Sequence, residues 1–436
     1  MILVLGGGVT GLAAGRVLEA AGEDFLVLER EDEPGGWCRS IPAGKYTFDM
    51  SGHFLHVSDP VLREWILGVP GVPWREVERD ARILLKGRLT PYPFQVHLNG
   101  HAPAFVSRCL ADFAAQRIRA AIHGDRTPNH LAEWLIQRFG KAMCEAFFFP
   151  YNGKMWRTPL ARLGYEWTDW SVPVPRFEDL LDGASGGVRK GMGYNARFHY
   201  PARGGIGALV GALARPLGAR VRTGARVARI DLRRKVVHTS AGDALPYRAV
   251  ISTIPLPGLA ACSEGLSSSA RRAASSLKWV KVLAINLGIC GAGPTPGHWM
   301  YVPEPRYPFF RVGFLSNVAP SSAPRGCASV FVEKSFPANA RVNVDREIGK
   351  AVRGLKRMGV LRGGSRIEEL RPVMLDPGYV LFDGARSKGV SLLAGEFARR
   401  DVILAGRYGA WDYFGMDRSI ADGLRAAGLA ARSHGR

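Results

Sequence analysis

The chain has 436 residues, of which 47% are hydrophobic and 22% are charged, a composition typical of an ordinary globular protein. The length allows two or three domains with a complete core, and no apolar run approaches the roughly 18 residues that span a bilayer, so we expect no stable membrane insertion. The net charge of +21 favours anionic ligands, but dispersed Arg and Lys residues argue against a nucleic-acid partner.

The first 30 residues carry the most informative pattern. An apolar strand precedes a glycine turn and a helical stretch, and a second apolar strand then ends at Glu29. Gly6 allows the tight turn, Gly8 lets the backbone approach a pyrophosphate, and Gly11 lets helix and strand pack closely. The N–H groups at the helix start would bind phosphates, and Glu29 would accept hydrogen bonds from a ribose. The pattern predicts a dinucleotide site.

The segment after Glu29 favours FAD over NAD. Gly35 and Gly36 form a second glycine turn, and a loop with Gly52 and His53 follows. An NAD enzyme would normally continue with further βαβ units, whereas short strands and glycine loops follow here. Taken alone, the Gly35-Gly36 pair is also compatible with a plain surface turn. Together with the first turn, it resembles the FAD-binding arrangement of the amine oxidase and protoporphyrinogen oxidase superfamily.

Helical, mixed and alternating patterns follow along the chain. Apolar spacing predicts helices over 104–123 and 131–149, and α/β character returns over 194–259. Alternation predicts a second sheet from about 278 to 385, and a strand at 402–407 precedes a last helix. We therefore predict an α/β fold in which a Rossmann-like FAD-binding domain is interleaved with a helical domain and a mainly antiparallel β-sheet domain. The expected boundaries are 1–98, 191–262 and 389–436 for the FAD-binding domain, 99–190 for the helical substrate and flap domain, and 263–388 for the β-sheet substrate domain.

The cysteines show no Cys-x-x-Cys pair. Their scatter favours buried, reduced thiols in a cytoplasmic protein over disulfides or a metal site. The first strand also lacks the basic segment of a signal peptide. We expect a cytoplasmic protein without a metal cofactor, whose reduced thiols are Cys38, Cys109, Cys144, Cys262, Cys290 and Cys327.

Several separated stretches together point to one family. Any one of them could occur by chance, but they stand in order behind the FAD pattern and cover nearly the whole chain. In that order they resemble UDP-galactopyranose mutase, most closely its eukaryotic-type branch. The stretches are residues 91–95, 150–156, 195–198 with 201–205, 299–301 with 310–311 and 316–317, and 406–413.

This resemblance implies an FAD-dependent isomerase of carbohydrate biosynthesis. Such mutases interconvert the pyranose and furanose forms of a nucleotide sugar through an adduct between N5 of the reduced flavin and the sugar, and they need NAD(P)H or another reductant. A departing nucleoside diphosphate must be stabilised by a cation, and Arg311 matches the family's diphosphate arginine. His53 should lie against the isoalloxazine, and Asn195 should lie beside the flavin and the diphosphate. These are the catalytic candidates.

Further binding residues follow from the same resemblance. Aromatic residues on one strand face, such as Trp299 and Tyr301, and single tyrosines are more often part of a core, so these assignments depend on the family match. The sugar pocket would include Trp299 and Tyr301, and the diphosphate tyrosines would be Tyr379 and Tyr413. The uridine end would include Gln95, Tyr151 and Asn152, with Trp156 nearby. The FAD would also contact Gly406, Arg407, Asp417 and Ser419.

Two positions depart from the family pattern. The family has a second diphosphate arginine on a flap, where the matching position here is Ser171, with Arg176 as a nearby candidate to replace it. The loop at residues 414–418 is also short. A lost charge-assisted phosphate contact costs about 1.5–3 kcal/mol. Such a loss points to a different sugar nucleotide or to a substrate with less phosphate. The missing arginine and the FAD pattern also leave an FAD-dependent oxidoreductase of the amine oxidase or protoporphyrinogen oxidase type as an alternative, and outside catalysis the alternative is a flavin-binding scaffold protein.

Overall fold

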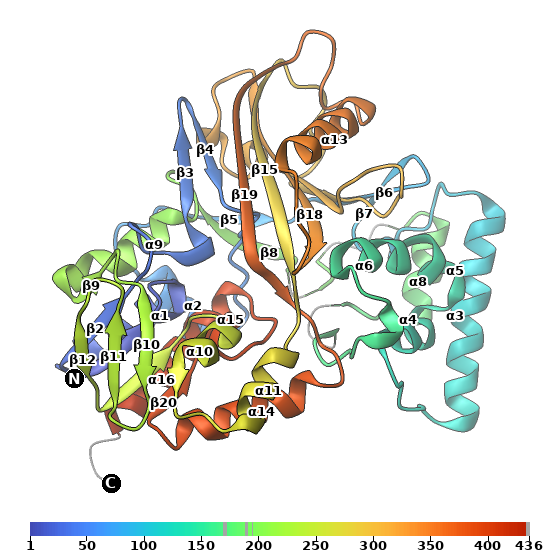
Figure 1. The fold of residues 1–436 in the computed structure, drawn as a ribbon. Helices are drawn as coiled ribbons and strands as arrows, with labels where there is room; N and C mark the ends of the chain where they lie inside the picture. The colour runs from blue at the N-terminus through green and yellow to red at the C-terminus, as the bar shows by residue number, and fades with distance from the viewer. Residues whose placement is uncertain (169–171, 188–190, 194, 433–436) are drawn as a thin grey trace.

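The computed structural model describes residues 1–168, 172–187, 191–193 and 195–432. A five-stranded parallel sheet in the order β20-β13-β1-β2-β9 holds the chain's first strand at its centre (Figure 1). Every side chain of β1 is buried, and alternate ones enter two different cores, which explains its continuous apolar run. The strands are β1 (Ile2–Leu5), β2 (Phe25–Leu28), β9 (Val221–Arg222), β13 (Ala249–Ser252) and β20 (Val402–Leu404).

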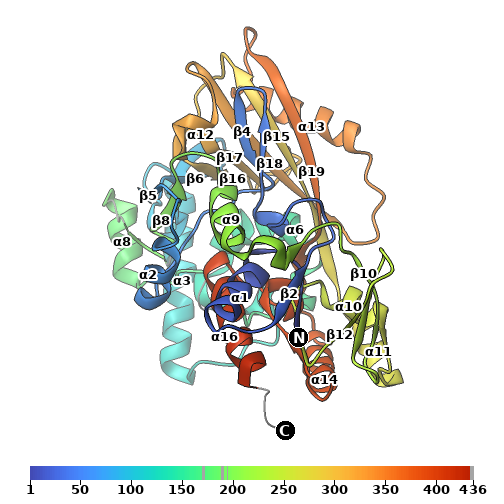
Figure 2. The ribbon, with the colours of Figure 1, turned by 90° about the vertical axis from the view of Figure 1, so that its left-hand side faces the viewer.

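Helices from both ends of the chain cover this sheet. Figure 2 shows α1 and α16 side by side, with α9 next to α1. The approach is close because a Cβ at Gly423 would overlap the backbone of Thr10. A four-stranded sheet, β12-β11-β10-β14, lies at the edge of this layer. The elements are α1 (Val9–Ala20), α2 (Pro60–Leu67), α9 (Gly207–Ala214), α10 (Leu256–Cys262), α11 (Ser268–Ser276), α14 (Arg386–Ala398), α15 (Gly406–Gly409), α16 (Met416–Arg432), β10 (Val227–Asp231), β11 (Val236–Thr239), β12 (Ala244–Pro246) and β14 (Ser263–Glu264).

A seven-stranded sheet forms the second large layer. Its order is β19-β15-β18-β17-β16-β6-β7, and every pair except β16 with β6 is antiparallel. The structure confirms the sheet predicted over residues 278–385 and adds β6 and β7, which come from the segment expected to bind FAD. The strands are β6 (Ala81–Leu85), β7 (Arg88–Pro91), β15 (Trp279–Cys290), β16 (Trp299–Tyr301), β17 (Arg311–Phe314), β18 (Cys327–Pro337) and β19 (Arg366–Val380), with α12 (Leu315–Val318) and α13 (Val344–Arg357) beside them.

The helical layer corrects one prediction. The helix expected over 131–149 is interrupted at Gly140, whose φ of 77° is left-handed. A Cβ there would lie 2.7 Å from Cβ of Asp112, so glycine permits the close crossing that breaks the helix. Helical turns then continue to Trp156. The helices are α3 (Pro103–His123), α4 (Leu131–Phe139), α5 (Lys141–Met143), a π-helical turn (Cys144–Phe148), α6 (Phe149–Trp156) and α8 (Phe177–Ser185).

A β-hairpin joins the two large layers. It consists of β3 (Ser40–Ala43) and β4 (Tyr46–Asp49), while β5 (Trp74–Glu78) pairs with β8 (Arg197–Pro201) nearby. At the hairpin's base, the carboxylate of Asp49 accepts hydrogen bonds from Ser40 Oγ and Tyr200 OH, each at 2.6 Å. Burial raises the pKa of Asp49 to about 6, although these hydrogen bonds oppose the rise. The buried network fixes the hairpin against β8 and, through the Ile206 N–H that donates to Asp49 at 3.1 Å, against the start of α9.

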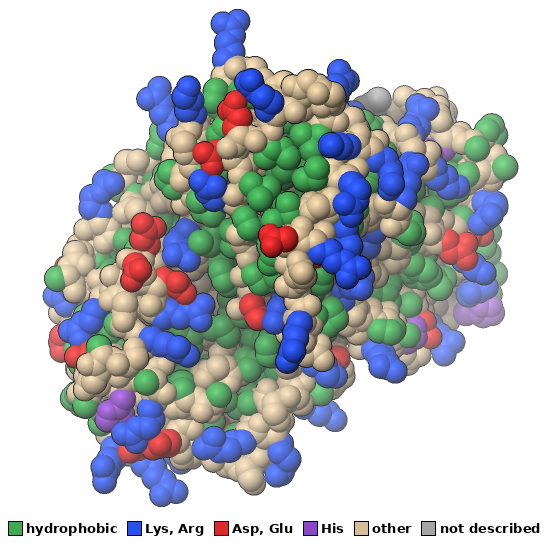
Figure 3. All heavy atoms as spheres, turned by 45° about the horizontal axis from the view of Figure 1, so that its top comes forward, with side chains coloured by type: hydrophobic (Ala, Val, Ile, Leu, Met, Phe, Trp, Pro, Cys, Tyr) green, Lys and Arg blue, Asp and Glu red, His purple; other side chains and the backbone are tan. Residues whose placement is uncertain are grey.

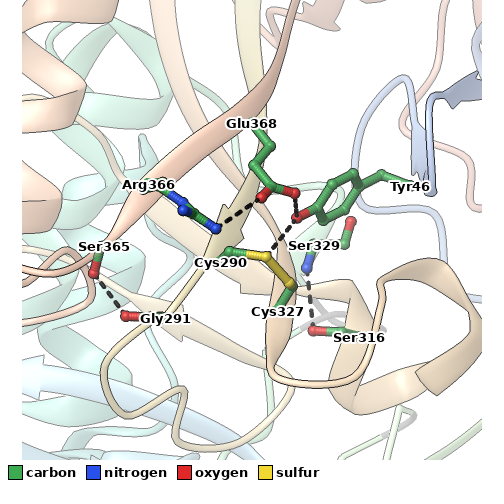
Figure 4. The surroundings of a disulfide bond; sticks show 9 residues. All are labelled: Tyr46, Cys290, Gly291, Ser316, Cys327, Ser329, Ser365, Arg366 and Glu368. Carbon is green, nitrogen blue, oxygen red and sulfur yellow. Dashed lines mark hydrogen bonds and ion pairs between the residues drawn. A yellow bond between two sulfur atoms is a disulfide. The ribbon is translucent and has the colours of Figure 1, made fainter.

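The expectation that all six cysteines are reduced is wrong for one pair. Cys290 and Cys327 form a disulfide between β15 and β18, where their Cα atoms lie 4.1 Å apart (Figure 4). The two residues are 37 positions apart in the sequence, and the strand register that brings them together cannot be read from their spacing. The remaining cysteines are free, and Cys262 is the least buried of them.

The surface carries the positive charge as a spread of single residues. Figure 3 shows Lys and Arg side chains over the whole of one face, among hydrophobic and uncharged groups. Within the described ranges, no helix combines the length and the apolar character that a bilayer crossing requires.

Candidate active site

One cavity of about 1080 Å³ lies where the two large sheets and the helical layer meet. Residues from all five expected segments reach it, although those segments lie far apart in the sequence. The fold therefore brings together most of the residues that the sequence singled out. These are Gly6, Gly8, Glu29, Gly35, Gly36, Gly52, His53, Gln95, Tyr151, Asn152, Asn195, Trp299, Tyr301, Arg311, Tyr379, Arg407, Tyr413 and Ser419.

The glycine turn has the geometry that its pattern predicted. Gly6 has a φ of 101°, which favours glycine. A Cβ at Gly11 would overlap the carbonyl oxygen of Gly6, so α1 can approach the turn only with glycine there. A Cβ at Gly8 would meet nothing within 4 Å, and Gly8 lines the cavity. The start of α1 thus presents open backbone to the cavity, as a phosphate requires.

The second glycine turn lies directly on the first. The N–H of Gly35 donates to the carbonyl oxygen of Gly7 at 2.7 Å, and Gly35 bridges to Gly8. Gly35 and Gly36 both have positive φ, at 125° and 55°. The pair is therefore part of the cavity wall and not a plain surface turn.

Glu29 ends β2 inside the cavity. Its carboxylate accepts hydrogen bonds from the N–H of Gly7 at 2.7 Å and of Glu31 at 3.0 Å. The side chain is buried, and carboxylate oxygens retain further lone pairs for a ribose hydroxyl. The structure thus holds Glu29 at the position that the dinucleotide pattern requires.

The C-terminal part supplies a further part of the wall, next to α1. Ser419 in the first turns of α16 lines the cavity, as do Gly415 and Met416 before it. Gly406 stands behind this wall, where a Cβ would overlap Thr10. Asp417 also lies outside the lining, and burial raises the pKa of its carboxyl group.

Arg311 enters the cavity from β17, held by a buried carboxylate. Its Nε and Nη2 donate to Glu333 at 2.5 and 2.6 Å, and the two residues are direct neighbours on β17 and β18. Glu333 also accepts hydrogen bonds from Ser51 Oγ and from the N–H of Gly52. Although burial opposes ionisation, Arg311 keeps the pKa of Glu333 below its usual range. The network ties the cation to the loop that carries His53.

His53 lies on this loop beside two cations. Its Nδ1 is 3.0 Å from the carbonyl oxygen of Ser51. Burial lowers the pKa of His53 to about 4, and Arg311 and Arg407 lower it further while Glu333 opposes the shift. The imidazole is therefore neutral near pH 7.

A second guanidinium lies among tyrosines. The Arg407 guanidinium carbon is 4.8 Å from the ring centre of Tyr413 and 5.3 Å from that of Tyr379, and Nη1 donates to the carbonyl oxygen of Phe414 at 2.5 Å. In the described part of the chain, no carboxylate forms an ion pair with Arg407. Burial raises the pKa of both tyrosines, which keeps their phenols protonated and able to donate.

Aromatic residues from two elements, α6 and β16, and from the loop after β4 form the rest of this end. Tyr151 packs edge-on against Tyr301, with ring centres 5.3 Å apart, and Trp299 stacks on Phe54 at 5.0 Å. Trp299 and Tyr301 both line the cavity, where the family resemblance placed them. Burial raises the pKa of Tyr151 well above its usual value.

The residues expected at the uridine end differ in their access to the cavity. Asn152 bridges Trp156 Nε1, at 2.9 Å, and the carbonyl oxygen of Phe148. Trp156 is fully buried and does not line the cavity; it packs against Tyr379 and Tyr413. Trp156 therefore supports the wall from behind.

Among the described residues of the flap region, none supplies a replacement cation at the wall. Ser171 lies outside the described residues. Arg176 is exposed at the start of α8, where its guanidinium is 3.7 Å from Asp179 and does not line the cavity. Instead, Arg79 lies beside the site: it donates to the side chain of Asn195, and its guanidinium carbon is 4.7 Å from the ring centre of Tyr92.

Glu333, Ser51 and Arg79 also contribute to the site, although no sequence pattern singled them out. A signal for Glu333 exists, because it shares a strand face with Phe331 in an otherwise apolar alternating stretch. A buried carboxylate in such a position demands a cationic partner. Ser51 and Arg79 carry no local pattern, since their roles depend on contacts between distant segments.

Comparison with known proteins places the chain in a family. Residues 9–291 match the family model described as flavin containing amine oxidoreductase. A crystal structure of reduced UDP-galactopyranose mutase is similar over 100% of this chain and 96% of its own, with 26% identity and a TM-score of 0.91. A putative protoporphyrinogen oxidase from Exiguobacterium sp. 255-15 (17% identity, TM-score 0.72, 99% and 98% of the two chains) and a cyclohexylamine oxidase from Brevibacterium oxydans (16% identity, TM-score 0.71, 100% and 99%) share the fold.

Curated relatives match only in part. A probable flavin-containing monoamine oxidase A from Dictyostelium discoideum is 35% identical over 74 residues, which are 16% of each chain. An uncharacterized protein from Methanothermococcus thermolithotrophicus is 48% identical over 54 residues, 12% of this chain. The matched part spans about half the length of that second relative.

The chain is a flavoenzyme with the α/β fold described above. It belongs to the flavin-containing amine oxidoreductase family, and its cofactor is FAD. The cavity fits that cofactor, because Gly8 leaves open space at the start of α1 and Glu29 offers a buried carboxylate beside it. The start of α16 at Ser419 closes the same space from the C-terminal part.

Proposed function

We propose that the protein is an FAD-dependent mutase that interconverts pyranose and furanose forms of a nucleotide sugar. The similarity to UDP-galactopyranose mutase over the whole chain supports this function, as does the arrangement of cations and phenols at one end of the cavity. We place the reaction in cytoplasmic carbohydrate biosynthesis, with NAD(P)H or another reductant for the flavin.

The observation that carries the proposal is the pair Arg311 and Arg407. Both guanidiniums lie at the cavity wall, and tyrosines surround Arg407. Glu333 neutralises Arg311, whereas no described carboxylate pairs with Arg407. An uncompensated, half-buried cation attracts an anion such as a diphosphate. The same charge repels the ammonium group of an amine substrate.

In this proposal, each wall residue has a distinct task. Arg311 stabilises the diphosphate as it departs. Arg407, which the family resemblance assigned to FAD, is given the same task here because its guanidinium lies beside Tyr379 and Tyr413, whose protonated phenols donate hydrogen bonds to the diphosphate oxygens. Glu333 fixes the direction of the Arg311 guanidinium through its two hydrogen bonds. The chemistry that FAD supplies when bound is that of a nucleophile in its reduced form.

The remaining residues bind and orient the sugar nucleotide. Trp299 and Tyr301 offer flat apolar faces to the sugar. Gln95 and Tyr151 lie toward the helical layer, where the proposal places the uridine. Neutral His53 beside the flavin position can exchange a hydrogen bond without adding charge. Asn195 lies beside Arg79 at the same wall.

Product analysis tests the mutase proposal. Enzyme reduced with dithionite should convert UDP-galactofuranose to the pyranose form, as separated by anion-exchange chromatography, while oxidised enzyme should not. Other nucleotide furanoses form a second series, because Ser171 stands where the family has its second diphosphate arginine and a different sugar nucleotide could be the substrate. The proposal fails if reduced, FAD-loaded enzyme converts none of them.

An oxidoreductase of the amine oxidase or protoporphyrinogen oxidase type is the second candidate function. The family model and the fold shared with the two oxidases favour it. Such an enzyme would consume oxygen or another acceptor with each turnover. An oxygen electrode with aliphatic amines and porphyrinogens as substrates separates the two functions, because a mutase leaves the acceptor concentration unchanged.

A further inference from the structure

The disulfide between Cys290 and Cys327 closes the far end of two strand ladders. Cys290 is the last β15 residue paired with β18 and the last paired with β19. Figure 4 shows the sulfurs beside Tyr46, whose OH lies 3.5 Å from Cys290 Sγ and donates to Glu368 at 3.0 Å. Both cysteines are half-buried. A small reductant can therefore reach the bond from solvent.

The chain between the two cysteines carries part of the candidate site. That segment of residues 291–326 contains β16 and β17, and with them Trp299, Tyr301 and Arg311. The disulfide is the covalent link that joins the two ends of this segment. Beyond the disulfide, β18 carries Glu333, the partner of Arg311. Greater mobility at the ends of this segment should therefore also increase the mobility of β16 and β17, which carry these three side chains.

The β3–β4 hairpin makes a second connection to the cavity. At its tip, the Tyr46 ring packs on Gly288, where a Cβ would lie 2.8 Å from ring atoms. Along β4, the carbonyl oxygen of Thr47 accepts a hydrogen bond from Ser329 Oγ on β18 at 3.2 Å. Two residues beyond the hairpin, Ser51 donates to Glu333. The hairpin thus runs from the disulfide to the loop beside the flavin position.

We propose that Cys290 and Cys327 are a reversible thiol–disulfide modification site, opened by a dithiol reductant, whose state sets how tightly the cavity holds a diphosphate ligand. The identity of that ligand rests on the proposed function. Opening breaks the S–S bond: it takes up two electrons and two protons to give two thiols, and the reductant's dithiol becomes a disulfide. An oxidised dithiol partner closes it by the reverse exchange.

The closed form should bind the ligand more tightly. Removing the cross-link returns conformational freedom to residues 291–326, so more entropy is lost when a ligand orders Arg311 and the aromatic residues. We expect the dissociation constant of UDP to rise about fivefold or more, the lower end of typical coupling between sites.

Peptide mapping and UDP titration test the proposal on the FAD-loaded protein. Digestion without reductant should yield the Cys290–Cys327 cross-linked peptide. Dithiothreitol, without denaturant, should open it, and iodoacetamide should then label both cysteines. After removal of the reagents, UDP is titrated by the change in flavin absorbance. A bond that never forms, a bond that resists native reduction, or equal UDP dissociation constants in the two states would each overturn the proposal.

Variants and a ligand-independent readout complete the experiment. C290S/C327S should bind UDP as weakly as the reduced protein in either condition, whereas C109A, which removes a free thiol on α3, should keep the response. Limited proteolysis should cut the open form faster within residues 291–326, and equal cutting overturns the proposal. If UDP binds neither form, the mutase function fails while faster cutting still supports the modification site.

One metal-binding outcome would also overturn it. Ligand atoms of Cys290, Cys327 and Glu368 lie within 4.8 Å of one another. Stoichiometric uptake of Co²⁺ by the reduced protein, with thiolate charge-transfer absorbance, would assign a metal site there in place of a thiol–disulfide site.

Discussion

At the residue scale, the carboxylate of Glu333 fixes the position of the Arg311 guanidinium. Glu333 is fully buried and accepts two hydrogen bonds from the guanidinium. Such a pair adds little net stability compared with an apolar pair, but removing one partner leaves the other charged and unpaired. Arg311 is thus coupled to both binding and folding.

Replacing Arg311 should therefore affect binding and stability together. For R311M we expect UDP to bind about tenfold to a hundredfold more weakly, because a charge-assisted phosphate contact is lost. The free energy of unfolding should fall by about 3–5 kcal/mol, because Glu333 stays buried without a cation. Absorbance titration and urea unfolding measure the two effects. R311M/E333L is the control: it should recover stability but not UDP binding. Full UDP affinity in R311M would contradict the assignment.

The lowered pKa of His53 gives a prediction for acid. The pKa of His53 is about 4 in the folded protein and about 6.5 in the unfolded chain. Between these two pH values, the imidazole is neutral in the folded protein but protonated in the unfolded chain. The stabilisation is present above pH 6.5 and is lost as the pH falls toward 4. The wild type should therefore lose up to about 3 kcal/mol more than H53Q over this window, as measured by urea unfolding at several pH values.

Asp49 provides the internal check on that comparison. Its folded pKa is raised to about 6, so its contribution changes in the opposite direction, but it is present in both proteins and cancels in the difference. Parallel pH curves for wild type and H53Q would show that His53 is not buried as a neutral base.

The family resemblance singled out Arg311 as a candidate but gave no sign of its partner Glu333. The family motif around Arg311 is local, whereas Glu333 becomes meaningful only through the register of β17 with β18. The same limit applies to Cys290 and Cys327, whose pairing is also a matter of register. Contacts set by strand pairing are the part of the site that the sequence pattern did not show.

At the scale of elements, the first turn was predictable because each glycine answers a local demand. Gly6 needs a positive φ and Gly11 needs space against the turn. By contrast, the break at Gly140 was missed, because the crossing of Asp112 that requires it comes from a distant part of α3. Demands set by the local backbone can thus be predicted from the sequence, whereas contacts between distant elements cannot.

Two alanine substitutions in this turn should separate folding from cofactor binding. G11A should lower the free energy of unfolding of the apoprotein by several kcal/mol, because its Cβ overlaps the backbone of Gly6. G8A meets no protein atom, so the apoprotein should keep its stability while FAD binds more weakly. Thermal unfolding of the apoprotein and FAD titration by fluorescence quenching measure both. Equal apoprotein stability in G11A and G8A would refute this division of roles.

At the scale of the whole molecule, the charge of +21 surrounds a cavity with buried cations. Lys and Arg side chains spread over the surface raise the local concentration of anions without forming one dense patch. Salt screens such a field over roughly 10 Å at 0.1 M. The salt dependence of ligand binding should therefore be stronger for a ligand with more negative charge.

We expect UDP to bind more weakly at about 0.5 M than at about 0.05 M NaCl, with the larger change in the association rate. Uridine, which lacks the diphosphate, should show a much smaller change and serves as the matched ligand. Stopped-flow measurement of the flavin signal separates the two rates. Identical salt dependence for UDP and uridine would exclude a role of the protein's field in capture.

The overall architecture was largely predictable, because the parallel sheet, the helical layer and the large antiparallel sheet each have their own period. The exact division into domains stays a prediction. β6 and β7 show why: they lie in a segment assigned to FAD binding, yet they pair with β16 in the other sheet. A domain boundary at one position in the sequence therefore cannot describe a segment whose strands pair in both domains.

The cofactor cavity is closed by residues from opposite ends of the chain, with Gly6 at one end and Ser419 at the other. During synthesis the early strands β1 and β2 leave the ribosome long before α16 exists. One edge of β1 stays unpaired until β13 has been made, and β20 then pairs with the far edge of β13. The complete cavity can thus form only after residue 419 has emerged, and incomplete chains expose apolar strands that favour aggregation.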